Sequence, residues 1–212
     1  MALTFTAASS QYLTTTSTPV SSAPLTISVI ASIDSVPSST RALCTIESGN
    51  SNILYMLYTT SQRLAFYAEG ASGNGTSIIN SPLVSAGSYF HACAVVNSAS
   101  NRIVYLNGTI SNTNTTNIGA TAVNRINIGS RYYGGALGAY QNGPIAEVGI
   151  WSAALTAAEV ASLAKGMTCD KVRPQSLVFY APLVRDLIDQ KGGRAITNNN
   201  GATVETHPRV YA

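Results

Sequence analysis

The side chains that could catalyse a reaction are few in this chain, and they lie far apart in the sequence. Hydrolysis of a glycosidic bond needs two carboxyl groups about 5–9 Å apart. One strand can supply them when acidic residues alternate, because alternate residues share a face. No such pattern is present: Glu147 is alone on its predicted strand, and the other glutamates are isolated in the sequence, namely Glu47, Glu69, Glu159 and Glu205. We therefore expect no enzyme. A divergent glycoside hydrolase is the second alternative, with Glu147 as its strand carboxylate.

The other groups used in catalysis or metal binding are equally sparse. His91 falls on a predicted central strand, where we expect a hydrogen-bonded core imidazole, and His207 precedes Pro208. Asp186 and Asp189 are close together, but "RDLIDQKGG" is typical of a solvated turn. No G-x-S-x-G, HExxH or phosphate-binding loop occurs. We expect no catalytic residue, no cofactor and no metal ion.

The cysteines indicate a reducing environment. Cys44, Cys93 and Cys169 are odd in number and widely spaced, without a CxxC pair, so we expect buried free thiols. The stretch Met1 to Ser10 lacks the basic and apolar regions of a secretory signal. We therefore expect synthesis in a reducing cytoplasm.

One glycine-rich stretch has the residue types of a sugar-binding loop. Aromatic rings can stack on the C–H face of a sugar ring, while amides and hydroxyls bind its oxygens, and binding residues are frequent on loops. The stretch "RYYGGALGAYQN" therefore predicts a glycan site. An alternative is that Tyr132 and Tyr133 only pack on the sheet edge. The candidate residues are Arg131, Tyr132, Tyr133, Tyr140, Gln141 and Asn142.

Composition excludes several classes of protein. Charged residues make up 10% of the 212 residues and the net charge is +3, without a basic run, so we expect no nucleic acid as a partner. Charged residues usually supply about a quarter of a chain. Here Ser, Thr and Asn, which together supply roughly 30% of the residues, provide most of the polar surface instead. No stretch approaches the twenty apolar residues of a membrane span, so we expect no membrane insertion.

Alternating hydrophobicity predicts many short antiparallel strands. In "LTISVIASI" the residues Leu25, Ile27, Val29, Ala31 and Ile33 share one face, which predicts a half-buried strand. Residues 53–60 and 63–69 flank a Ser-Gln turn and predict a hairpin, and residues 88–96 predict a strand in the middle of a sheet. Asn107-Gly108 suits a type I′ turn, because both of its central positions need positive φ. Close spacing of such strands favours a sandwich or barrel.

A single helix is predicted at residues 156–165. Thr156 and Glu159 form a T-x-x-E capping box, and Leu155 and Val160 are spaced as a hydrophobic staple. The cap contributes about 1 kcal/mol, too little to hold three turns without tertiary packing. We expect this helix to close one end of the sandwich as a purely structural element.

The order of these segments resembles the laminin-G-like, concanavalin A-like jelly-roll superfamily. The matching stretches are "SYFHACAVVNSASNRIVYLNGTIS", "RINIGS" and "GPIAEVGIWSAALTAAEVASL", and they span about residues 3 to 166. Ala146 stands where this family commonly has Asp. The resemblance implies an all-β, two-sheet antiparallel jelly-roll sandwich with one short helix near 156–165. We expect the jelly-roll domain at residues 1–170, with residues 171–212 adding edge strands and contacts to it.

Composition and the ending "HPRVYA" resemble laminin-G-type proteins of tailed bacteriophages. The resemblance implies a non-enzymatic virion surface protein, such as a capsid decoration, head fibre or tail accessory, assembled in the bacterial cytoplasm. Its partners would be other virion proteins, copies of itself and host-surface or environmental glycans. The alternative is a soluble, lectin-like carbohydrate-binding module. The predicted subunit or particle contacts are Tyr180, Val184, Leu187, Val210 and Tyr211.

Overall fold

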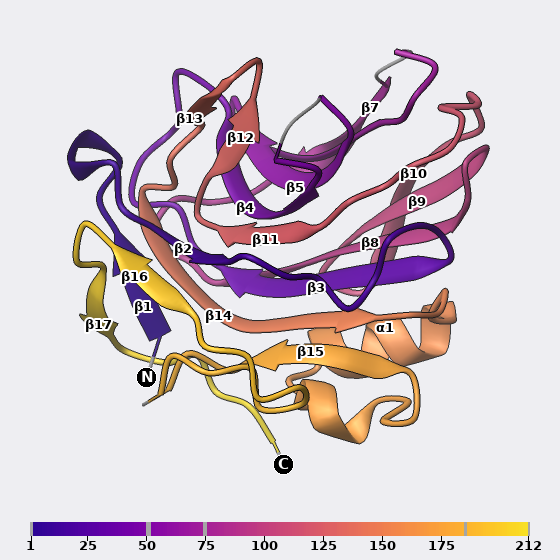
Figure 1. Cartoon of the computed structure of the whole chain (residues 1–212). Coiled ribbons are helices and arrows are strands. Elements are labelled where there is room, and N and C mark those ends of the chain that lie inside the picture. Colours follow the sequence, from indigo (N-terminus) through magenta and orange to yellow (C-terminus); the bar gives the residue numbers. More distant parts are fainter. Residues whose placement is uncertain (1, 50–51, 74–75, 185, 212) are drawn as a thin grey trace.

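The protein is a sandwich of two antiparallel β-sheets, as the computed structural model in Figure 1 shows. It describes residues 2–49, 52–73, 76–184 and 186–211, and for residues 76–82 the backbone alone. Sheet A contains, in spatial order, β10 (Thr109–Asn114), β9 (Asn101–Leu106), β8 (Phe90–Ser98), β3 (Leu25–Ala31), β14 (Gly143–Trp151), β1 (Ala2–Phe5) and β17 (Thr203–Glu205). Sheet B contains β16 (Thr197–Asn199), β2 (Tyr12–Thr15), β11 (Arg125–Ile128), β4 (Arg41–Glu47), β5 (Leu54–Thr60), β6 (Arg63–Glu69) and β7 (Thr76–Leu83). The predicted all-β, two-sheet fold is confirmed.

The main core lies between the sheets and follows the predicted alternation. Leu25, Ile27, Val29, Ala31 and Ile33 all belong to it and are at most 1% exposed. The predicted hairpins also form: β5 and β6 pair from Leu54↔Glu69 to Thr60↔Arg63, and β8 lies between β3 and β9. Asn107 and Gly108 have φ of 50° and 79°, as a type I′ turn requires.

A second layer covers the outer face of sheet A, so β3 is not half-buried as expected. Its outward residues Thr26 and Ser28 are at most 2% exposed. The Thr26 hydroxyl donates to the Ala153 carbonyl (2.8 Å) and accepts from the Leu155 amide (3.0 Å), which fixes the start of the helical segment. Polar residues that alternation assigns to solvent therefore anchor this layer.

The helix is part of this second layer. Helix α1 (Ala157–Ala164) has both halves of the predicted capping box, with Thr156 as N-cap. It packs on the outer face of sheet A rather than closing an end of the sandwich, and Figure 1 shows it below β14. Its buried side chains share an apolar cluster with β15 (Leu177–Ala181). Val160 and Leu163 join a separate apolar cluster with Trp151, whose indole N–H donates to the Val172 carbonyl (2.8 Å).

The C-terminal segment contributes strands to both sheets. β15 pairs with the second half of β14, whose first half pairs with β1. β16 pairs with β2 in sheet B, and β17 pairs with β1 in sheet A. Asp189 lies in this segment but not in a solvated turn: it is fully buried, accepts from the Tyr180 amide (2.9 Å) and pairs with Arg194 (2.7 Å). The expectation was wrong for Asp189, because the segment folds back onto β15, and it is confirmed for Asp186 and residues 190–193, which are exposed.

The remaining elements are short. Two 3₁₀ turns cover Ala7–Ser9 and Cys169–Lys171, and a two-stranded hairpin consists of β12 (Arg131–Tyr133) and β13 (Ala136–Gly138). Cys44, Cys93 and Cys169 are free and buried, as predicted. Within the described ranges, no helix has the length and apolar character needed to cross a bilayer.

Candidate functional site

The β12–β13 hairpin folds over the outer face of sheet B, on the side away from sheet A (Figure 1). Beneath it lies a small apolar cluster that is separate from the main core, and Tyr133 and Ala139 pack against this cluster from the hairpin side. The hairpin is therefore packed against the sheet and is not a free loop. The buried members of the cluster are Ala42, Leu54, Met56, Tyr58 and Ala65.

Glu47 fixes the first strand of the hairpin. Its side chain is fully buried, and one carboxylate oxygen accepts from the backbone N–H of Tyr132 at 2.7 Å. The other oxygen accepts from the side-chain amide of Asn127. Burial raises the pKa of Glu47 to about 7, although the Tyr132 amide and the charges of Arg125 and Arg131 act in the opposite direction.

Glu69 fixes the hairpin from a different strand. Its Oε2 accepts from the hydroxyls of Tyr67 (2.6 Å) and Tyr133 (3.0 Å), and the two rings meet edge to face with centroids 6.4 Å apart. Glu47 and Glu69, isolated in the sequence, thus lie beneath one hairpin. Both carboxylates are occupied by hydrogen bonds that hold backbone and rings in place.

An open pocket of about 310 Å³ lies beside this hairpin. Arg131 stacks on the Tyr133 ring with 4.9 Å between the guanidinium carbon and the ring centroid. Arg41 donates from Nη1 to the Tyr140 carbonyl (2.9 Å), and the Tyr140 ring lies 6.2 Å from that of Tyr12. The pocket is lined by Ser39, Thr40, Arg41, Arg131, Ala139 and Tyr140.

Arg41 also lines a neighbouring pocket of about 260 Å³, together with Asn142 and residues 35–38. Asn142 accepts from the Ala7 amide at 3.2 Å, so its side chain is held at the rim. Arg41, Ser39 and Thr40 were missed in the sequence. The available signal was weak: Arg41 is a single cation after a Ser/Pro-rich stretch in a chain with few charges.

The six predicted glycan-site residues divide into two groups. Arg131, Tyr140 and Asn142 line the pockets, whereas Gln141 is fully buried and donates to the Ser32 carbonyl (2.8 Å). Tyr132 lies beside Arg125, 5.5 Å from guanidinium carbon to ring centroid. Tyr133 packs on the outer face of sheet B, not on a sheet edge as the alternative assumed. Gln141, Tyr132 and Tyr133 therefore do not line the two pockets, although the Tyr133 ring supports the Arg131 guanidinium.

Glu147, the strand carboxylate of the hydrolase alternative, lies on the other sheet. It is 4% exposed and accepts from the Tyr180 hydroxyl (2.7 Å), with His207 Nε2 3.3 Å from its other oxygen. It therefore lies under the C-terminal segment.

The predicted subunit or particle contacts differ in exposure. Tyr180 is 6% exposed and so cannot belong to a contact surface, whereas Tyr211 is 58% exposed. Val184, Leu187 and Val210 are half-buried.

A serine and a histidine also meet on the outer face of sheet A. Ser28 Oγ lies 2.9 Å from His91 Nε2, which confirms a hydrogen-bonded imidazole. Burial lowers the pKa of His91 to about 4, which makes it a poor base, and Ser28 is 2% exposed. His91 Nδ1 has no hydrogen-bond partner in the described part of the chain. The pair lacks both the access and the orienting acid of a nucleophilic triad.

Within the ranges that the structure describes, no three His, Cys, Asp or Glu side chains gather as metal ligands would. What the outer face of sheet B offers instead is a fixed, partly aromatic, cationic pocket. A two-sheet jelly roll with such a surface belongs architecturally to the lectin-like sandwiches.

A family model described as the concanavalin A-like lectin/glucanases superfamily matches residues 7–161. The chain belongs to this superfamily. No match was found among curated proteins.

Several solved structures share the fold. The heptameric SAP-like pentraxin of Limulus polyphemus superposes with a TM-score of 0.71 and 18% identity, over 97% of this chain and 94% of that one. A CBM40 of a Ruminococcus gnavus sialidase, bound to α2,3-sialyllactose, gives 0.57 and 13%, over 68% and 84%. Domain 4 of a Geobacillus stearothermophilus arabinanase, in complex with arabinotriose, gives 0.54 and 19%, over 69% and 68%. At these identities the likeness shows the fold alone.

Proposed function

We propose that this chain is a non-catalytic glycan-binding domain, and that sugars bind in the pocket beside the β12–β13 hairpin. Two of the structural neighbours are sugar-binding domains solved with a bound oligosaccharide, which favours the lectin-like alternative over the virion prediction. The observation that carries the proposal is the pocket itself, in which Arg41, Arg131 and Tyr140 surround about 310 Å³. This volume is at the lower end of the range for small-molecule sites.

The pocket has the groups that sugar recognition needs. Tyr140 offers an aromatic face, and Ser39 and Thr40 add hydroxyls that can both donate and accept. Arg41 and Arg131 bring guanidinium donors that match a carboxylate in a fork geometry. Because no acidic side chain lines the pocket among the described residues, we expect sugars that carry a carboxylate to bind more tightly than neutral ones.

The pocket is preformed. Glu47 and Glu69 hold the hairpin from below, and the Tyr133 ring supports the Arg131 guanidinium. A site that is already ordered loses less conformational entropy when a ligand binds. The same contacts support a non-catalytic role, because both carboxylates are covered by the hairpin that they hold.

A glycan array with neutral and carboxylated sugars tests the proposal. The wild type should give a defined set of positive sugars, and Tyr140→Ala and Arg131→Gln should each weaken binding at least about tenfold, the equivalent of one good hydrogen bond or stacking contact. Tyr211→Ala and Lys171→Gln are the matched controls, because both change exposed residues outside the pocket. A blank array, or equal losses in the controls, would reject the proposal.

The virion-surface role remains a prediction from sequence resemblance. A glycan-binding domain on a particle surface would combine both roles, since adhesion to host glycans is one of the contacts predicted for such a protein. Mass spectrometry of purified particles tests location independently of sugar binding. Absence of the chain from the particles would refute the virion assignment and leave the glycan-binding proposal standing.

A further inference from the structure

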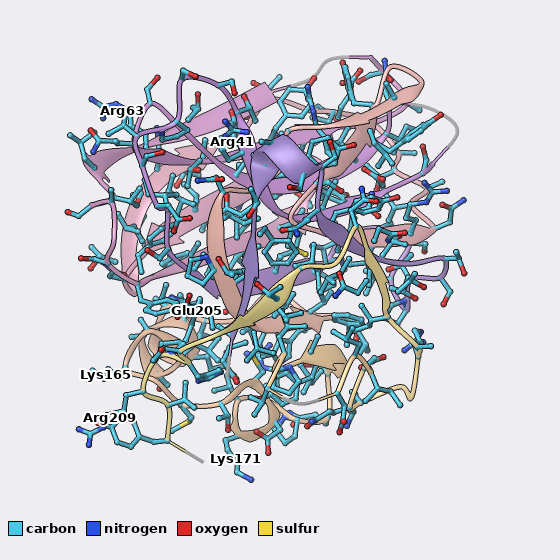
Figure 2. All side chains as sticks on the ribbon, turned by 90° about the vertical axis from the view of Figure 1, so that its left-hand side faces the viewer. Arg41, Arg63, Lys165, Lys171, Glu205 and Arg209 are labelled. Carbon is cyan, nitrogen blue, oxygen red and sulfur yellow. The ribbon has the colours of Figure 1, made fainter. Side chains whose placement is uncertain are left out.

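A second pocket, of about 250 Å³, lies on the opposite side of the molecule from the hairpin. Its walls are the start of β8, the C-terminal end of α1 and the last residues of the chain. His91 and Ile30 form its floor on the outer face of sheet A, and the exposed Lys165 and Arg209 stand at its rim. Figure 2 shows both cations on the same side of the molecule, near the C-terminal end.

The floor holds a buried hydrogen-bonding atom without a partner. His91 is 4% exposed, its Nε2 lies 2.9 Å from Ser28 Oγ, and its Nδ1 has no partner among the residues described. If the serine hydroxyl donates to Nε2, the proton of the neutral ring is on Nδ1, and one N–H donor lacks an acceptor. In the other tautomer Nε2–H donates to the serine oxygen and Nδ1 is an acceptor without a donor, so Nδ1 lacks a partner in both. A bound anion would favour the first tautomer, because only that one has an N–H donor at Nδ1.

Asn107 adds a second donor to the pocket. Its Oδ1 accepts from the backbone N–H of His91 at 2.9 Å, which directs this oxygen to the strand. The remaining hydrogen-bonding group of the side chain is its NH₂. With the His91 proton on Nδ1, the polar floor offers N–H donors from two side chains, and what it lacks is an acceptor.

The rim of the pocket is positively charged, which favours an anionic hydrogen-bond acceptor as the ligand. No carboxylate lines the pocket, and neither Lys165 nor Arg209 forms an ion pair within the described residues. The C-terminus of α1 opposes an anion with roughly half an elementary charge. Three of its last four carbonyls, those of residues 161–163, accept from the amides of Lys165, Gly166 and Met167. Two full positive charges outweigh this partial charge.

We propose that this pocket binds an oxyanion, with Lys165 and Arg209 at the rim and the N–H groups of His91 and Asn107 at the floor. The anion is an inorganic phosphate or sulfate, or the same group on a larger ligand. This site is distinct from the sugar pocket and shares none of its lining residues. Its occupation would also tie the C-terminal residues to β8 and α1.

NMR titration of the full chain with phosphate and with sulfate, at constant ionic strength, tests the proposal. The expected result is a saturable change at His91, Asn107 and Gly166, together with a ring proton on Nδ1 in the long-range ¹⁵N spectrum. Lys165→Gln and Arg209→Gln should each weaken binding about tenfold, as expected for loss of one charge-assisted hydrogen bond. Lys171→Gln, a cation already paired with Asp170, should leave it unchanged.

A parallel titration with a sugar phosphate monoester distinguishes the two sources of the anion. A response to the free ion assigns the pocket to the ion itself, and a response to the ester alone assigns it to the group on a larger ligand. Three results would overturn the proposal: no saturable response to any of these probes, equal weakening by Lys171→Gln, or a ring proton on Nε2 in the presence of saturating ligand.

Discussion

Glu47 and Glu69 lie in one row across three neighbouring strands of sheet B, because each is paired in register with Leu54 of β5. With strands about 4.8 Å apart, their Cα atoms are roughly 10 Å apart. In a glycosidase such a pair would face an open cleft. Here the β12–β13 hairpin covers both, and their oxygens accept from the Tyr132 amide and the Tyr133 hydroxyl. The pair works as an anchor for the hairpin beside the pocket that we propose as the glycan site.

Removing the charge of Glu47 should change how stability depends on pH. The folded state raises the pKa of this carboxyl from 4.5 to about 7, mainly by burial, so it holds the proton more tightly than the unfolded chain does. Stability from this group is therefore full below pH 4.5 and is lost as pH rises through 7, by up to about 3 kcal/mol. Urea unfolding from pH 5 to 8 should show this loss in the wild type and not in Glu47→Gln.

Glu205→Gln is the matched control, because Glu205 is exposed on β17. Its profile should run parallel to that of the wild type. Parallel profiles for the wild type and Glu47→Gln would contradict the role of Glu47 as a buried, proton-binding anchor.

The two tyrosines on Glu69 should compensate for each other. Tyr67→Phe and Tyr133→Phe each remove one hydroxyl from Oε2 and should each lower the free energy of unfolding by about 1 kcal/mol. The double variant leaves this oxygen without either hydroxyl and should cost more than the sum of the two. Chemical denaturation of all four proteins measures the coupling, and strict additivity would show that the hydroxyls act independently.

His91 should remain neutral well below the usual range for histidine. Burial lowers its pKa to about 4, so the folded state excludes a proton that the unfolded chain binds near pH 6.5. Stability from this group is present above pH 6.5 and is lost as pH falls through 4, by up to about 3 kcal/mol. A pH titration of the His91 ring by NMR measures this directly. A midpoint near 6.5 would mean that the imidazole is not buried as described.

The cap of α1 offers a test of the second layer. Thr156→Ala removes the hydroxyl that accepts from the Glu159 amide and should destabilise the protein by about 1 kcal/mol. Thr156→Ser keeps a hydroxyl at this position and should stay within a few tenths of the wild type. Urea unfolding of the three proteins decides the matter. An equal loss in both variants would point to packing of the methyl group instead of the cap.

Local patterns predicted most of the strands but not the layers outside the sheets. The alternation from Leu25 to Ile33, the turn at Asn107 and the capping box of Thr156 are all set by neighbours in the sequence. The burial of Thr26 depends on the segment that leads into α1, more than 120 residues away, which no local pattern encodes.

Only part of the candidate site could be predicted, because only part of it lies in one stretch of the sequence. Arg131, Tyr140 and Asn142 lie within one aromatic, glycine-rich stretch that composition alone singles out. Arg41 comes from the start of β4, far from this stretch in the sequence, and contacts it by a hydrogen bond to the Tyr140 carbonyl. The pairing of Glu47 with Glu69 depends on the register of three strands, so the two residues look isolated when the sequence is read along the chain.

Chemical-shift mapping with the strongest sugar from the array tests glycan binding most directly. The proposed site predicts that the largest saturable changes fall on residues 39–41, on Arg131 and on residues 139–142, and that Tyr140→Ala abolishes them. Saturable changes centred elsewhere on the molecule, or no sugar that produces any, would contradict the assignment of the hairpin pocket as the glycan site.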